Sequence, residues 1–147
     1  MENIEINKAN KSMEKIFEAE YNNGQGPKEL SALALAYVGD AVFEMLVRTR
    51  VLSWGNAPVN ILNKKARGIV NAKAQSDMYF RIEDILTDEE KSVFRRGRNT
   101  KSHTVPKNAD IMDYRHATGL EAVFGYLYLS GNIERAIELF DKGMERK

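Results

Sequence analysis

Two stretches of this 147-residue chain are almost continuously apolar, and they limit the folds open to it. The first, LSALALAYVGDAVFEMLVRTRVL, spans residues 30–52, and the second, ATGLEAVFGYLYL, spans residues 117–129. A helix that is apolar on nearly every face belongs at the centre of a core. We therefore expect an all-α protein with central helices over about 28–52 and 114–129.

The rest of the chain contains residues that typically begin and end helices. Its three prolines, Pro27, Pro58 and Pro106, fall where the apolar periodicity breaks. Thr87, followed by three acids, is a favourable N-cap, and Ser130-Gly131 predicts a helix end. The expected helices cover residues 11–21, 28–52, 58–80, 87–97, 114–129 and 132–144, with an exposed basic loop over 98–110. No repeat or second domain is visible, so we expect one domain over 1–147.

Composition removes several functional classes. The chain has no cysteine and only two histidines, which excludes disulfides, thiolate zinc sites and cysteine nucleophiles. The N-terminus lacks the pattern of a secretory signal, and no apolar stretch reaches the roughly 18 residues of a membrane span. A cytoplasmic protein is therefore expected.

Charge is segregated along the chain although the formal net charge is only +1. Residues 45–76 and 91–107 each contain six basic side chains and no acid, so all 21 acids lie elsewhere. Such segregation suits a soluble protein that presents a basic face to a polyanion, and a phosphate backbone is the natural partner. The alternative is that these runs are ordinary solvated helix faces.

Both apolar stretches carry isolated carboxylates. Asp40 and Glu44 are the only charged residues between Glu29 and Arg48, and Glu121 is the single acid of the second stretch. A buried carboxylate is costly unless it is paired, hydrogen-bonded or bound to a metal. If the two helices cross near Asp40 and Glu121, the pair would form an oxygen-rich pocket suited to Mg²⁺, and metal-assisted phosphodiester hydrolysis would follow.

A purely structural role remains an alternative for each acid. Asp40 and Glu121 could pair with Arg48, Arg115 or a buried tyrosine. Glu44 is expected to pair with Arg48 one turn later. Asp110 is expected to be a solvated loop acid or a helix cap.

Two segments resemble the ribonuclease III family. LALAYVGDAVFE (33–44) is similar to its signature helix, E-F-L-G-D-[AS]-V-L-E, and EAVFGYLYL (121–129) is similar to its second acidic motif, E-A-L-[IL]-G. The segments RRGRNTKSHTVPKN (95–108) and YRHATGLEA (114–122) resemble a small subgroup, Mini-ribonuclease III. That subgroup consists of the catalytic domain without a double-stranded-RNA-binding domain. The motif-bearing core would cover about 28–145.

The resemblance implies an all-α homodimeric endonuclease that hydrolyses double-stranded RNA with Mg²⁺ and leaves 5′-phosphate ends. Its substrate in the subgroup is the precursor of large-subunit (23S) ribosomal RNA. Asp40 and Glu121 match the family's catalytic, metal-binding acids. Two other family acids are replaced, by Ala36 and Thr118, as they are in the subgroup. These departures motivate the alternative of a catalytically inactive RNA-binding protein.

The basic residues are the candidates for RNA contact. Duplex RNA is recognised mainly through its shape, its phosphates and its 2′-hydroxyls. We expect a phosphate-binding track and a basic arm that completes it, made of Lys64, Lys65, Arg67, Lys73, Arg95, Arg96, Arg98, Lys101 and Lys107. A ribosomal protein that presents the substrate is a further expected partner. His103 is expected to be a surface residue, and Trp54 a core or dimer anchor.

Overall fold

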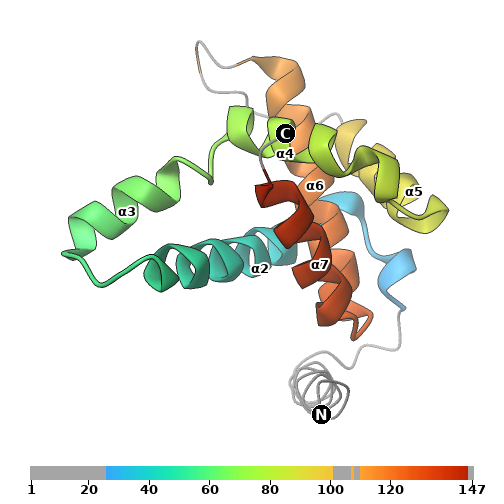
Figure 1. Ribbon diagram of the computed structural model, residues 1–147. Coiled ribbons are helices and arrows are strands. Elements are labelled where there is room, and N and C mark those ends of the chain that lie inside the picture. Colours follow the sequence, from blue (N-terminus) through green and yellow to red (C-terminus); the bar gives the residue numbers. More distant parts are fainter. Residues whose placement is uncertain (1–25, 101–106, 108–109, 146–147) are drawn as a thin grey trace, which may run out of the picture.

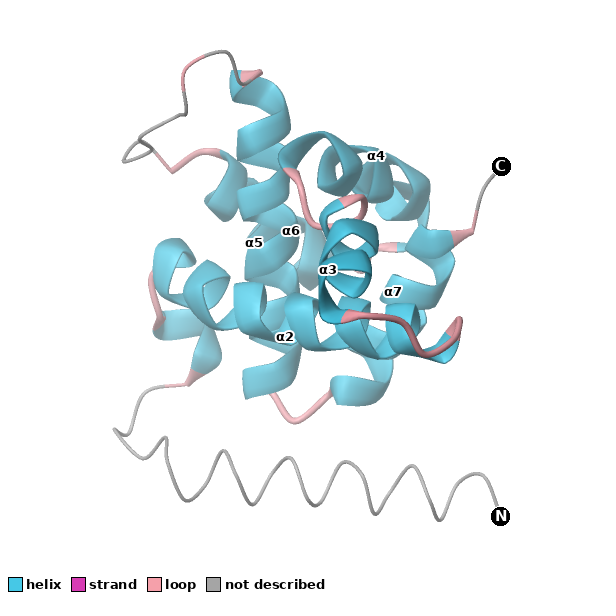
Figure 2. Ribbon diagram, turned by 90° about the vertical axis from the view of Figure 1, so that its left-hand side faces the viewer, coloured by secondary structure: helices cyan, strands magenta, loops and turns pink. Residues whose placement is uncertain are grey.

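The computed structural model describes residues 26–100, 107 and 110–145, and in this part every regular element is a helix (Figure 2). The predicted all-α fold is thus confirmed. The elements are η1 (Pro27–Glu29), α2 (Ala32–Ser53), α3 (Val59–Arg67), α4 (Ala72–Ile82), η2 (Glu83–Ile85), α5 (Asp88–Arg98), α6 (Ile111–Leu129) and α7 (Ile133–Met144). The helix expected over residues 11–21 lies outside the described residues, as do Lys101 and His103. No helix in the described ranges is long and apolar enough to cross a bilayer.

Helix α6 is the centre of the fold. It packs against α2, α4, α5 and α7, which surround it in Figure 1. Its buried side chains include Phe124, whose ring meets Phe43 of α2 edge-on at 5.5 Å between centroids. Phe43 also makes an edge-on contact with Phe140 of α7, so three helices share one aromatic core.

Local sequence explains the ends of the helices. The Thr87 hydroxyl accepts a hydrogen bond from Glu90 N, and the Glu90 carboxylate accepts one from Thr87 N, which completes a capping box for α5. Asn132 caps α7 in a similar way. Gly131, with φ of 73°, makes the turn predicted between α6 and α7.

The structure corrects three predicted boundaries. Pro27 begins only a 3-10 turn, and α2 starts after the Ser31 cap. The helix expected over 58–80 is two helices, because the chain turns at 68–71 and Asn71 caps α4 through Ala74 N. Helix α6 begins at Ile111, three residues earlier than expected, since Asp110 caps it through Met112 N and Asp113 N.

Helix α2 is less enclosed than its composition predicted. One face packs on α6, but a second face, which adjoins α6, exposes Tyr37 (82%) and Met45 (47%). Together with Tyr128 of α6 and other side chains of α2, they line a hollow of about 600 Å³. The apolar character of this second face therefore serves something other than the monomer's core.

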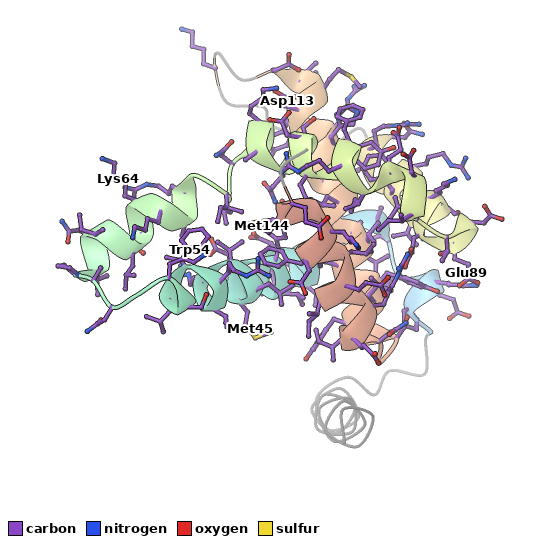
Figure 3. All side chains as sticks on the ribbon, in the orientation of Figure 1. Met45, Trp54, Lys64, Glu89, Asp113 and Met144 are labelled. Carbon is purple, nitrogen blue, oxygen red and sulfur yellow. The ribbon has the colours of Figure 1, made fainter. Side chains whose placement is uncertain are left out.

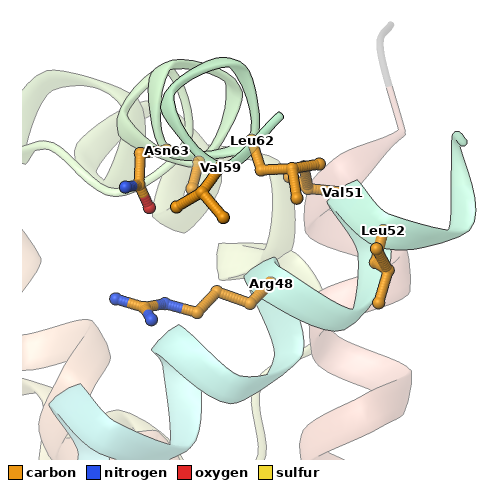
Figure 4. Close-up of a pocket in the computed structure, with 7 residues that line it drawn as sticks. Arg48, Val51, Leu52, Val59, Leu62 and Asn63 are labelled. Carbon is orange, nitrogen blue, oxygen red and sulfur yellow. The ribbon is translucent and has the colours of Figure 1, made fainter. Parts of the chain in front are cut away.

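Helix α3 stands away from the rest of the molecule and packs chiefly on α2 (Figure 1). Side chains of the two helices line a small cleft of about 200 Å³, among them Val51 and Arg48 of α2 and Leu62 and Asn63 of α3 (Figure 4). Trp54, at the end of α2, is 55% exposed, so it is not a core residue of the monomer.

Candidate active site

The close crossing of α2 and α6 builds the candidate site. A methyl group at Gly39 of α2 would lie 1.6 Å from the Glu121 carbonyl oxygen, and one at Gly125 of α6 would lie 1.9 Å from the Leu35 carbonyl oxygen. Only glycine allows the two backbones to approach this closely. The crossing puts Asp40, the neighbour of Gly39, beside the turn of α6 that carries Glu121.

Asp40 and Glu121 line one cavity of about 290 Å³ where α2, α4 and α6 meet. Asp40 is exposed, whereas Glu121 is largely buried. Apart from these two acids, the walls are uncharged side chains: Leu33, Ala36, Tyr37, Ala72, Gln75, Tyr114, Ala117 and Thr118. The predicted meeting of the two acids is therefore present in the fold.

Among the described residues, no basic side chain neutralises the two carboxylates. Within the described ranges, neither Asp40 nor Glu121 forms an ion pair with a lysine or arginine. Arg48, the partner considered for them, instead bonds Glu44 at 3.0 Å, as predicted for Glu44. Burial and then the charge of Asp40 raise the pKa of Glu121 to about 7, and burial and then Glu44 raise the pKa of Asp40.

The donor set fits a hard divalent cation. Mg²⁺ is typically held by one or two carboxylates and keeps several waters, and the cavity offers two carboxylates with space beside them. The described residues contain no group of three or more acids and histidines that could hold a metal. Ala36 and Thr118 line the cavity without adding a charge, and the Thr118 hydroxyl donates to the Tyr114 carbonyl of its own helix.

The predicted RNA-contacting residues fall into two groups. Lys64, Lys65 and Arg67 are exposed on the outlying helix α3, where Figure 3 labels Lys64, and Lys73 follows on α4 next to Ala72 of the cavity wall. Arg95, Arg96 and Arg98 lie at the end of α5, which contacts α6 where Gly97 meets Gly119. Lys107 is exposed, and Lys101 lies outside the described residues.

Some of these cations already have partners. Arg96 donates to the backbone carbonyl oxygens of Leu30 (2.6 Å) and Lys28 (3.4 Å), and so ties α5 to the segment before α2. Lys73 bonds Asp77 at 3.0 Å, and Arg98 donates to Asn99. By contrast, Lys64, Lys65 and Arg67 project from α3 without an ion pair to any described residue.

The structure adds one residue to the site that the sequence did not single out. Gln75 of α4 is only 4% exposed, lines the cavity and donates from Nε2 to Glu121 Oε1 at 3.3 Å. A glutamine in a mixed polar helix carries no local signal, and only the packing of α4 on α6 reveals it.

Comparison with known proteins matches this arrangement to a family. The Ribonuclease III domain family matches residues 33–132, which include Asp40 and Glu121. The chain belongs to the ribonuclease III family. Members of this family are endoribonucleases that act on double-stranded RNA, generally with a divalent metal and usually as dimers.

Relatives named Mini-ribonuclease 3 are similar to this protein over most of its length. One from Clostridium tetani is 48% identical over 128 residues, covering 86% of this chain and 85% of the relative. One from Thermoanaerobacter sp. is 46% identical over 121 residues, covering 82% and 85%. A crystal structure of a protein from Fusobacterium nucleatum superposes with a TM-score of 0.70 at 36% identity, covering 77% of this chain and 90% of that one. The predicted resemblance to the subgroup is thus confirmed.

Proposed function

We propose that this protein is a Mg²⁺-dependent endoribonuclease that hydrolyses phosphodiester bonds in double-stranded RNA and matures the 23S ribosomal RNA precursor. The supporting observation is the cavity at the crossing of α2 and α6, where Asp40 and Glu121 converge without a cationic partner among the described residues. The precursor substrate is what the resemblance of the motifs to the Mini-ribonuclease III subgroup implies, and a cytoplasmic location would follow from such a substrate.

In this proposal Asp40 and Glu121 would be the residues that hold the cation. A divalent cation bound there supplies an activated water and offsets the negative charge that develops on the reacting phosphate. Asp40 is exposed to the solvent from which RNA would arrive, whereas Glu121 is more buried. The uncharged walls leave the charge of both acids available to the cation.

The basic groups would bind the duplex around this cavity. Lys64, Lys65 and Arg67 would reach phosphates from the outlying helix α3, which supports a role for them in binding. Lys73 follows Ala72 of the cavity wall on α4, and Arg95 and Arg98 lie at the end of α5, which packs on α6. For Arg96 we favour a structural role, because its guanidinium is bonded to backbone carbonyls.

We further propose that a second copy covers the exposed apolar face of α2. Tyr37, at 82% exposed, and Met45 border a hollow of about 600 Å³ that would accept a partner's side chains. Family members usually dimerise, and a homodimer would bring two cavities to one duplex. A ribosomal protein that presents the substrate stays a prediction from the sequence, with no surface assigned to it.

The decisive experiment is a cleavage assay with the Asp40→Asn variant. Asparagine keeps the shape of the side chain but cannot supply the negative charge that holds the cation. We expect cleavage of labelled duplex RNA with Mg²⁺ to fall by at least about 100-fold, while folding and RNA binding persist. Wild-type protein with a chelator and single-stranded RNA are the controls.

The same assay distinguishes the proposed endoribonuclease from an inactive RNA-binding protein. The uncharged Ala36 and Thr118 in the cavity wall suggest that alternative. Discrete cleavage products from the wild type would exclude that alternative. Full activity of Asp40→Asn would instead refute the proposed metal site.

A further inference from the structure

Gln75 is one of three buried polar or charged residues in the described part of the chain, together with Ser76 and Glu90. Each has a defined partner. Ser76 Oγ lies 2.9 Å from His116 Nδ1, Glu90 is bonded to Arg135, and Gln75 bonds the carboxylate of Glu121. Of the three, Gln75 is the one whose partner is a proposed cation ligand.

The fold fixes Gln75 in its place. Its backbone N–H donates to the Asn71 carbonyl oxygen at 2.9 Å, and Asn71 Oδ1 caps the same turn through Ala74 N. Ala72 and Gln75, one turn apart, form the α4 wall of the cavity. The amide of Gln75 is therefore presented to Glu121 from the first turn of a well-capped helix, rather than from a loop.

The chemistry of the partner distinguishes Glu121 from Glu90. Glu90 is bonded by the guanidinium of Arg135 at 2.9 Å, and such a positive charge would repel a cation. The amide of Gln75 restrains one oxygen of Glu121 and adds no charge. This contact suits a carboxylate that must be held in one orientation yet keep its charge for a ligand.

We propose that Gln75 is a positioning residue for the cation site: it holds Oε1 of Glu121 and leaves the other oxygen to the cation. This inference rests on the proposed function. Partners that orient metal ligands typically contribute 10- to 100-fold in metal affinity. Loss of the Gln75 amide should therefore weaken the cation site by about 10-fold or more.

The test measures Mn²⁺ binding by calorimetry to the purified full-length protein without RNA. Gln75→Met is the main variant. Methionine has a similar length and suits a helix but cannot donate a hydrogen bond. We expect the Mn²⁺ Kd to rise about 10-fold or more. In the cleavage assay, kcat should fall at low Mg²⁺ and recover at high Mg²⁺, while KM for RNA stays unchanged.

Ser76→Ala is the matched control, because Ser76 is equally buried on the same turn but bonds His116 instead. It should bind Mn²⁺ as the wild type does, whatever its loss of thermal stability. If Ser76→Ala weakens Mn²⁺ binding as much as Gln75→Met, the effect is general loosening of α4 and the positioning role is refuted. If Gln75→Met does not fold, Gln75→Asn, which keeps an amide on a shorter arm, replaces it with the same expected loss.

Glu121→Gln separates this inference from the proposed function. It should abolish Mn²⁺ binding. If it does so while Gln75→Met binds like the wild type, only the role of Gln75 is refuted. If Glu121→Gln itself binds Mn²⁺ like the wild type, the proposed cation site is wrong.

Discussion

At the scale of single residues, Glu90 and Glu121 show how the same side chain serves two purposes. Burial would raise the pKa of Glu90, but hydrogen bonds from Arg135 and Thr87 outweigh it and hold the pKa below its usual range. For Glu121, burial and the charge of Asp40 act in the same direction and raise the pKa to about 7. The ionised Glu90 therefore stabilises the fold, whereas ionisation of Glu121 destabilises the folded state when no metal is bound.

This destabilisation predicts a pH dependence of stability. Because the pKa of Glu121 is higher in the folded than in the unfolded state, its favourable contribution is complete below about pH 4.5 and is lost as pH rises through about 7. In a chelator, the free energy of unfolding should fall across this window by on the order of 3 kcal/mol relative to Glu121→Gln. Urea denaturation at a series of pH values measures the difference.

Saturating Mg²⁺ should restore the free energy of unfolding of the wild type at pH 8, because a bound cation favours the ionised carboxylates. Glu121→Gln should show no such rescue. Identical pH profiles for the two metal-free proteins would contradict the assigned cause of the pKa shift.

At the scale of elements, the crossing of α2 and α6 decides whether a site exists. The two helices meet at Gly39 and Gly125, and the contact is backbone to backbone. No side-chain rearrangement can make room for an added methyl group there, so the helices would have to separate.

Gly39→Ala is accordingly expected to destabilise the protein by about 3 kcal/mol or more, at the upper end of overpacking costs. Mn²⁺ binding should weaken as well, because Asp40 would move away from Glu121. Gly26→Ala is the control, since a methyl group at Gly26 meets nothing within 4 Å. Equal melting temperatures for the two variants would contradict this account of the crossing.

Elements also show where sequence reasoning succeeds. Helices α5 and α7 begin within a residue of their predicted starts, because the Thr87 cap and the Ser130-Gly131 helix end are local signals. The break at 68–71 has no clear signal in the apolar pattern, because Ile69 and Val70 continue the pattern of the flanking helices, and only the Asn71 cap marks the start of α4. Asp40 and Glu121 stood out as charges in apolar surroundings, whereas Gln75 and the carbonyl contacts of Arg96 depend on long-range packing.

At the scale of the whole molecule, the basic side chains of α3 are set apart from the body of the domain (Figure 1). If they contact phosphates, removing two of them should weaken binding of every duplex alike and change its salt dependence. The Lys64→Ala/Lys65→Ala double variant is expected to reduce the slope of log K against log salt by about 1 for each lost phosphate contact.

Binding is measured without divalent cations, so that no cleavage occurs. Lys28→Ala is the control, because Lys28 pairs with Glu89, which lies on the opposite side of the molecule from Lys64 in Figure 3. Its slope should equal that of the wild type. An unchanged slope for the double variant would remove α3 from the RNA-binding surface.

Tyr37 and Asp40 border both the carboxylate cavity and the apolar hollow on α2. Self-association and chemistry would then share one wall of the protein. The turnover rate per protein molecule would rise with enzyme concentration until every protomer is paired. Dilution alone would then abolish activity.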